Sequence, residues 1–134
     1  MKDPLMATLG FQVVRQGPGE AAVAGVVGEG HLNLHGTAHG GFLYALADAA
    51  FALASNSRGP AVALSCRMDY FRPVPLGARV EAVAEEVHLS RRTATYRVEV
   101  RASGKRVALF TGTVFRIGGE DVPAGTGDLT QGEA

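Results

Sequence analysis

The chain has 134 residues, and its 13 Lys and Arg residues balance its 13 Asp and Glu residues. This length is typical of one domain with its own hydrophobic core. The balanced charge, without a long run of one sign, does not fit a protein that binds nucleic acid or a membrane surface, so we expect neither as a partner.

The single cysteine, Cys66, cannot form an intrachain disulfide, and it has no clustered partners for a zinc site. The first residues lack the basic flank and apolar run of a signal peptide, and the longest apolar stretch is too short to cross a bilayer. We therefore expect a cytoplasmic protein without a metal.

The first patterned segments, residues 8–16 and 20–28, read as two strands joined across a Gly-Pro-Gly turn. They predict a hairpin at the start of the chain. A loop rich in Gly, His and Asn follows at residues 29–41.

Residues 42–55 are mostly Ala and Leu, with Asp48 as the one charged side chain, and they predict a helix. Because this helix is apolar on nearly every side, other elements must surround it.

The segments that follow the helix are rich in β-branched and aromatic residues, which favour strands. These segments are residues 62–72, 77–89, 93–103 and 105–117. The order of hairpin, helix and four strands lacks the alternation that builds a parallel sheet. We predict an α+β domain over residues 1–117, with an antiparallel sheet curved around one long central helix. The Gly-rich and acidic residues 118–134 predict a flexible tail.

Asp48 has no cationic neighbour three or four positions away on the predicted helix. Burial would raise the pKa of an unpaired carboxyl, and strongly perturbed acids occur often in functional sites. The alternative is a structural role, in which Asp48 caps a loop or pairs with an Arg from another strand.

The segment His39-Gly40-Gly41 stands at the start of this helix. The free N–H groups and the dipole of a helix N-terminus favour negative charge, and glycine lets a ligand approach closely. Such a site can stabilise the oxyanion formed from a carbonyl group. Alternatively, the two glycines only permit a tight turn.

Gly40 and Asp48 are eight residues apart, which is about 12 Å along a straight helix. One acyl group cannot be polarised at one of these residues and attacked at the other within a single chain. If both are catalytic, the acid must come from a second copy of the chain, so the spacing predicts a dimer.

Three stretches together resemble the hotdog-fold acyl-CoA thioesterases, and especially their phenylacetic-acid-degradation (PaaI) branch. They are residues 33–41 (Asn-Leu-His-Gly-Thr-Ala-His-Gly-Gly), 46–50 (Leu-Ala-Asp-Ala-Ala) and 70–77 (Tyr-Phe-Arg-Pro-Val-Pro-Leu-Gly). Leu34 stands where relatives more usually have a small residue. The resemblance implies a hotdog fold, dimers joined edge to edge into one continuous sheet, and often a dimer of dimers.

The resemblance also implies roles for individual residues. Asp48 would be general base or nucleophile towards the thioester, and the Gly40 N–H would polarise its carbonyl, with Gly41 beside it at the site. His39 would shape the turn, and Asn33 would orient the attacking water or the substrate. Ser65 matches a hydroxyl residue that faces the acid in some relatives.

Phosphates of the CoA substrate require cations, and Arg91 and Arg92, at a predicted hairpin turn, fit this role or are an ordinary solvated pair. CoA is part of the substrate, so no separate cofactor is expected. Aromatic residues in the predicted helix favour an aryl or medium apolar acyl group.

Two other functions remain open. A hotdog-fold dehydratase or hydratase would recruit His39 as a proton shuttle. A non-catalytic acyl-CoA sensor would need an output domain, for which this chain has no room.

Overall fold

The computed structural model describes residues 3–117, and the predicted tail at residues 118–134 lies outside the described residues. The helices are α1 (Pro4–Leu9) and α2 (Gly40–Asn56), with a short 3-10 turn, η1 (Glu29–His31), between them. The strands are β1 (Gln12–Gly17), β2 (Glu20–Val26), β3 (Ala61–Tyr70), β4 (Arg79–Leu89), β5 (Thr93–Ala102) and β6 (Lys105–Arg116).

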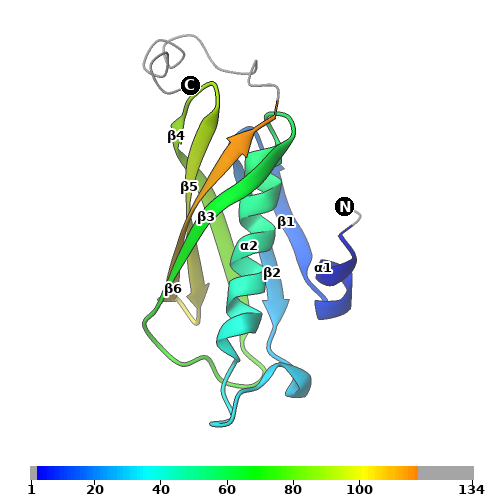
Figure 1. Ribbon diagram of the computed structural model, residues 1–134. Helices are drawn as coiled ribbons and strands as arrows, with labels where there is room; N and C mark the ends of the chain where they lie inside the picture. The colour runs from blue at the N-terminus through cyan, green and yellow to red at the C-terminus, as the bar shows by residue number, and fades with distance from the viewer. Residues whose placement is uncertain (1–2, 118–134) are drawn as a thin grey trace.

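The six strands form one antiparallel sheet in the order β1-β2-β4-β5-β6-β3. The sheet curves around α2, which contacts all six strands (Figure 1). This arrangement confirms the predicted α+β architecture of one central helix wrapped by an antiparallel sheet. The predicted helix and the four strands after it each agree with the structure to within two residues at either end.

The start of the chain differs from the prediction, because residues 8 and 9 belong to helix α1 and β1 begins only at Gln12. Asp3 caps α1 by accepting hydrogen bonds from the backbone N–H groups of Leu5 and Met6. Gly10 then ends the helix with a left-handed φ of 75°. Local capping chemistry therefore overrides the apolar pattern that suggested a strand.

Aromatic side chains fill the space between α2 and the sheet. The ring of Phe51 lies 5.2 Å from that of Phe110 and 6.0 Å from that of Tyr96. Fully burying one such apolar side chain stabilises a fold by roughly 1.5–3 kcal/mol. Gly112 makes room for this packing, since a Cβ there would lie 2.6 Å from Cζ of Phe51.

A polar cluster ties the C-terminal end of α2 to the sheet. The guanidinium of Arg58 bonds both carboxylate oxygens of Glu86, at 2.8 and 3.2 Å, and the Tyr96 hydroxyl donates to the same carboxylate at 2.9 Å. Arg116 donates to the backbone oxygens of Ser90 and Arg58. The turn between β4 and β5 is thereby held against this end of the helix.

Two surfaces remain partly exposed at the β3 edge of the sheet, one on strand β3 itself and one on helix α2. Strand β3 is an edge strand, and its Val62 and Leu64 side chains are 51% and 59% exposed. Beside it, a stripe of α2 that includes Tyr44, Ala45 and Asp48 is only partly buried. Exposed apolar edge strands of this kind are ready to pair with another chain.

Candidate active site

The first turn of α2 carries the predicted oxyanion donor. The backbone oxygen of His39 accepts hydrogen bonds from Phe42 and Leu43, and its Nδ1 accepts one from the Gly41 N–H at 2.8 Å. His39 is therefore the N-cap of the helix. The Gly40 N–H has no hydrogen-bond acceptor within residues 3–117, so it is free to meet a ligand at the positive end of the helix dipole.

Asn33 organises the loop that leads to this turn. Its side-chain oxygen accepts from the backbone N–H groups of His35 and Thr37, at 2.9 and 3.1 Å, and its amide nitrogen donates to the backbone oxygen of Ala38 at 3.4 Å. These bonds are typical of an Asx turn. In this structure the Asn33 oxygen is thus occupied by the loop, although the residue still lines the adjacent pocket.

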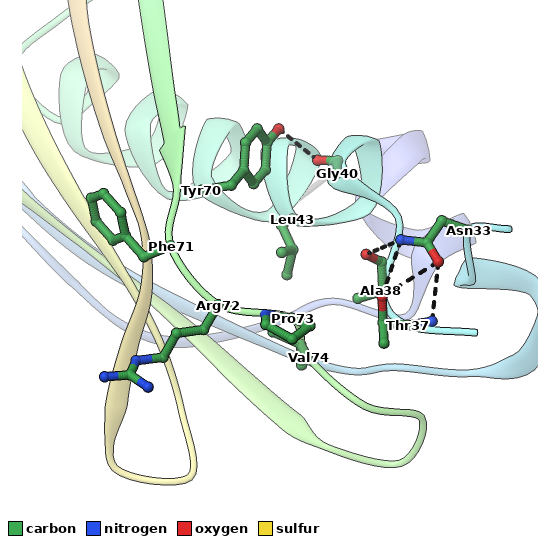
Figure 2. A pocket seen from close by; sticks show the side chains of 10 residues that line it. All are labelled: Asn33, Thr37, Ala38, Gly40, Leu43, Tyr70, Phe71, Arg72, Pro73 and Val74. Atoms are coloured by element: carbon green, nitrogen blue, oxygen red, sulfur yellow. Dashed lines mark hydrogen bonds between the residues drawn. The ribbon is translucent and has the colours of Figure 1, made fainter. Parts of the chain in front are cut away.

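An open pocket of about 360 Å³ lies at the helix N-terminus. Asn33, Thr37, Ala38, Gly40 and Leu43 form one wall, and the segment 70–74 forms the other (Figure 2). A backbone hydrogen bond of 2.8 Å from the Ala38 N–H to the Val74 oxygen joins the two walls. The lining is mostly apolar and includes Gly40, whose N–H is unpaired within residues 3–117. Such a pocket suits an apolar acyl group with its carbonyl at the helix N-terminus.

Asp48 lies two turns further along α2 and does not line this pocket. It is half-buried, and burial, together with the nearby charge of Asp3, raises the pKa of its carboxyl. No hydrogen bond or ion pair to Asp48 occurs in the described part of the chain. Gly40 and Asp48 lie on one unbroken helix, so they are about 12 Å apart along its axis, as the sequence predicted.

Ser65 does not lie near Asp48. A β-bulge between Ala63 and Ser65 shifts the register, so that Ser65 pairs with Thr113 and lines a hollow on the outer face of the sheet. Cys66, the next residue, packs against the core beside Tyr44. Burial, and then the nearby Cys66, raise the pKa of the Tyr44 hydroxyl to about 12. The expectation that the Ser65 hydroxyl faces the acid is therefore not met within this chain.

The structure also shows where the arginines predicted to bind the CoA phosphates lie. Arg91 and Arg92 are in the β4–β5 turn, next to the C-terminal end of α2, and that end is about 24 Å from Gly40 along the helix (Figure 1). The cation that lines the pocket is Arg72, which sequence reasoning treated only as part of a motif. Its place two residues after the end of β3 at Tyr70 was the available signal.

Neither a metal cluster nor a membrane-spanning helix occurs in the part of the chain that the structure describes. No cluster of three His, Cys, Asp or Glu side chains within residues 3–117 could hold a metal ion. No helix in the same range is long and apolar enough to cross a membrane.

One long helix enclosed by a curved antiparallel sheet is the arrangement of the hotdog fold. Comparison with known families agrees, because the model of the thioesterase superfamily matches residues 35–109. The chain belongs to this superfamily, and the predicted hotdog fold and thioester hydrolase class are confirmed.

Individual relatives narrow the comparison. The acyl-coenzyme A thioesterase PaaI of Escherichia coli is 41% identical over 119 residues, which cover 87% of this chain and 85% of that protein. An N33D mutant of the phenylacetic acid degradation protein PaaI from Thermus thermophilus is 76% identical, with a TM-score of 0.85 over 86% of this chain and all of that one. A Streptococcus mutans protein bound to acetyl CoA is 33% identical, with a TM-score of 0.77 over 81% and 89% of the two chains.

Proposed function

We propose that this thioester hydrolase acts on the CoA ester of an aryl or medium-length acid, such as phenylacetyl-CoA or a hydroxylated phenylacetyl-CoA, in cytoplasmic phenylacetate breakdown. Its products are the free acid and CoA. The similarity to PaaI of E. coli and to a protein bound to acetyl CoA supports the CoA ester. The mostly apolar pocket at the helix N-terminus supports an apolar acyl group.

The observation that carries this proposal is the pairing of a free Gly40 N–H in an apolar pocket with an unpaired, half-buried acid on the same helix. The thioester carbonyl oxygen accepts from the Gly40 N–H, which stabilises the negative charge of the tetrahedral intermediate. Asp48 either removes a proton from the attacking water or attacks the carbonyl carbon itself. The C–S bond then breaks, and the CoA sulfur leaves as a thiolate that takes up a proton. If Asp48 is the nucleophile, water then hydrolyses the mixed anhydride, which releases the free acid and restores the Asp48 carboxylate.

Both residues can act on one substrate only if they come from two chains, so the proposal includes a homodimer with its active sites at the subunit interface, and pairing of two such dimers. The open stripe of α2 that carries Asp48 and the exposed edge of β3 lie on the same side of the molecule. Pairing of two β3 edges would cover both surfaces and place two α2 helices side by side.

The CoA phosphates need cations, and the proposal assigns them to two places. Arg72 is at the pocket of its own chain. Arg91 and Arg92 lie at the opposite end of α2, so they can reach this pocket only from the partner subunit, as Asp48 does.

The structure disfavours the dehydratase alternative. A neutral His39 ring that accepts a hydrogen bond at Nδ1 carries its proton on Nε2. His39 could act as a base at Nδ1 only if it released the Gly41 N–H and so gave up its cap on the helix. The proposed hydrolysis needs no such release, because Asp48 is the base or nucleophile.

The proposal is tested with a panel of CoA esters that includes phenylacetyl, hydroxyphenylacetyl, benzoyl and straight-chain groups. Release of free CoA thiol is followed with a thiol reagent, and enoyl absorbance is followed in parallel. We expect thiol release, with the highest kcat/KM for an aryl ester. Loss of enoyl absorbance without thiol release would contradict hydrolysis and favour the hydratase.

A further inference from the structure

The peptide group between Gly40 and Gly41 is held at both ends by side chains. Its oxygen accepts a hydrogen bond of 2.9 Å from the Tyr70 hydroxyl, and its N–H donates to Nδ1 of His39 at 2.8 Å. The two side chains come from different places, since His39 precedes α2 and Tyr70 ends strand β3. Figure 2 shows the Tyr70 ring reaching across the pocket mouth to Gly40.

The Tyr70 ring also packs directly against the first residue of the helix. A Cβ added at Gly40 would lie 3.3 Å from both Cζ and the hydroxyl oxygen of Tyr70. The missing side chain therefore makes room for this ring as well as for a ligand. Tyr70 is 49% exposed and lines the same pocket, so this side chain belongs to the candidate site and not to the hydrophobic core.

Two adjacent glycines would otherwise make this the most adaptable part of the backbone, because glycine tolerates nearly all φ and ψ values. Rotation about the bonds of Gly40 would turn the following peptide plane and loosen the first helical turn. The donor N–H of Gly40 lies in the preceding His39–Gly40 peptide, so its direction relative to the helix depends on the same torsion angles of Gly40. An oxyanion donor is effective only when it is oriented before charge develops on the substrate.

We propose that Tyr70 is a positioning residue for the oxyanion donor: its hydroxyl, acting opposite the His39 ring, fixes the Gly40–Gly41 peptide plane and with it the torsion angles of Gly40. These angles set how the preceding peptide, which carries the Gly40 N–H, is directed towards the thioester carbonyl. This role deepens the proposed function and rests on it. Tyr70 itself need not touch the reacting atoms. A hydrogen bond on the carbonyl oxygen also polarises the same peptide, which strengthens the bond from its N–H to His39.

The test compares Tyr70→Phe, which keeps the ring and removes only the hydroxyl, with Tyr96→Phe as a matched control. The Tyr96 hydroxyl is buried and bonds Glu86, at the opposite end of α2 from Gly40. For Tyr70→Phe we expect kcat to fall about tenfold, with KM within about twofold of wild type and little change in Tm. For Tyr96→Phe we expect the reverse, a lower Tm with unchanged kcat.

A second measurement does not depend on activity. With ¹³C- and ¹⁵N-labelled glycine, we expect Tyr70→Phe to shift the Gly40 carbonyl resonance and to speed hydrogen exchange of the Gly41 N–H. Tyr96→Phe should leave both signals in place.

The outcomes separate the two proposals. If wild type hydrolyses an acyl-CoA ester and Tyr70→Phe has the same kcat, the positioning role is wrong. Unchanged glycine resonances in Tyr70→Phe would overturn it as well. If wild type hydrolyses no ester of the panel, the proposed function fails, and the glycine resonances alone decide whether Tyr70 holds the peptide.

Discussion

At the scale of single residues, the central observation is that the folded chain disfavours the charged form of Asp48. Its carboxyl is half-buried, the nearby Asp3 adds a like charge, and burial is the larger cause of its raised pKa. A protein selected only for stability would replace or pair such a group. The unfavourable environment of Asp48 is what makes it a better base than an ordinary surface carboxylate.

This environment predicts opposite effects on stability and activity. Because the pKa of Asp48 is higher in the folded chain, the folded state binds the proton more tightly, and the charged form destabilises the fold at neutral pH. That destabilisation decreases as the pH falls through the raised pKa and is absent below the ordinary value of 3.8. Asp48→Asn should therefore raise Tm at pH 7 but not below pH 3.8, while lowering kcat at least 100-fold at neutral pH.

Thermal unfolding and thiol release across the pH range check both effects. Asp3→Asn is the matched control, because Asn still caps a helix but carries no charge. It should move the acid limb of the activity profile to lower pH while keeping kcat. An Asp48→Asn variant as active as wild type would remove Asp48 from the mechanism.

At the scale of elements, the sequence was sufficient where patterns are long and local. The apolar run of residues 42–55 and the four strands after it agree with the structure, because their hydrophobic patterns reflect burial directly. Helix α1 was missed because six residues are too short to show a period, although Asp3, Pro4 and Gly10 are ordinary helix start and stop signals.

The site was predictable in part for the same reason. The sequence alone placed Gly40 just before a helix predicted to begin at residue 42, and Asp48 within that helix; the structure begins the helix at Gly40 itself. The bulge that turns Ser65 outward and the bond between Tyr70 and Gly40, residues 30 apart, depend on the register of β3, which no local pattern reports.

Packing between α2 and β6 gives a prediction at this scale. Gly112→Ala places a methyl group 2.6 Å from Cζ of Phe51, and we expect it to destabilise the fold by roughly 1–3 kcal/mol. Urea unfolding measures this loss. Phe51→Leu shortens the opposing side chain. The double variant should therefore lose less unfolding free energy than the sum of the losses in the two single variants. Strict additivity would show that the two residues do not compete for space.

At the scale of the whole molecule, the separation of Gly40 and Asp48 along one helix becomes a question of assembly. Gly40→Pro removes the proposed donor. Proline is tolerated at the first helical position, and the His39 backbone, at φ −62° and ψ 140°, suits a residue before proline. Its Cβ would lie 3.3 Å from the Tyr70 ring, which has to shift to make room. Asp48→Asn removes the acid instead. We expect each variant to be inactive alone.

Co-expression of the two variants should restore activity, because one of the two sites in a mixed dimer then combines an intact Gly40 with an intact Asp48. A mixed dimer should therefore have about half of the wild-type activity, and the unfractionated random mixture about a quarter per dimer. Purified mixed dimers with two different affinity tags provide the measurement. Mixed dimers without activity would mean that both groups act from the same chain or that one of them is not catalytic.

The strand order has a consequence for synthesis on the ribosome. Strand β3 is made directly after the central helix, but within residues 3–117 its one neighbour in the sheet is β6, the last strand of that range. Residues 61–70 therefore stay without a hydrogen-bonding partner, and that side of α2 stays uncovered, until residues 105–116 have emerged. A premature stop within β6 would remove two strands from the sheet although it deletes only one from the chain.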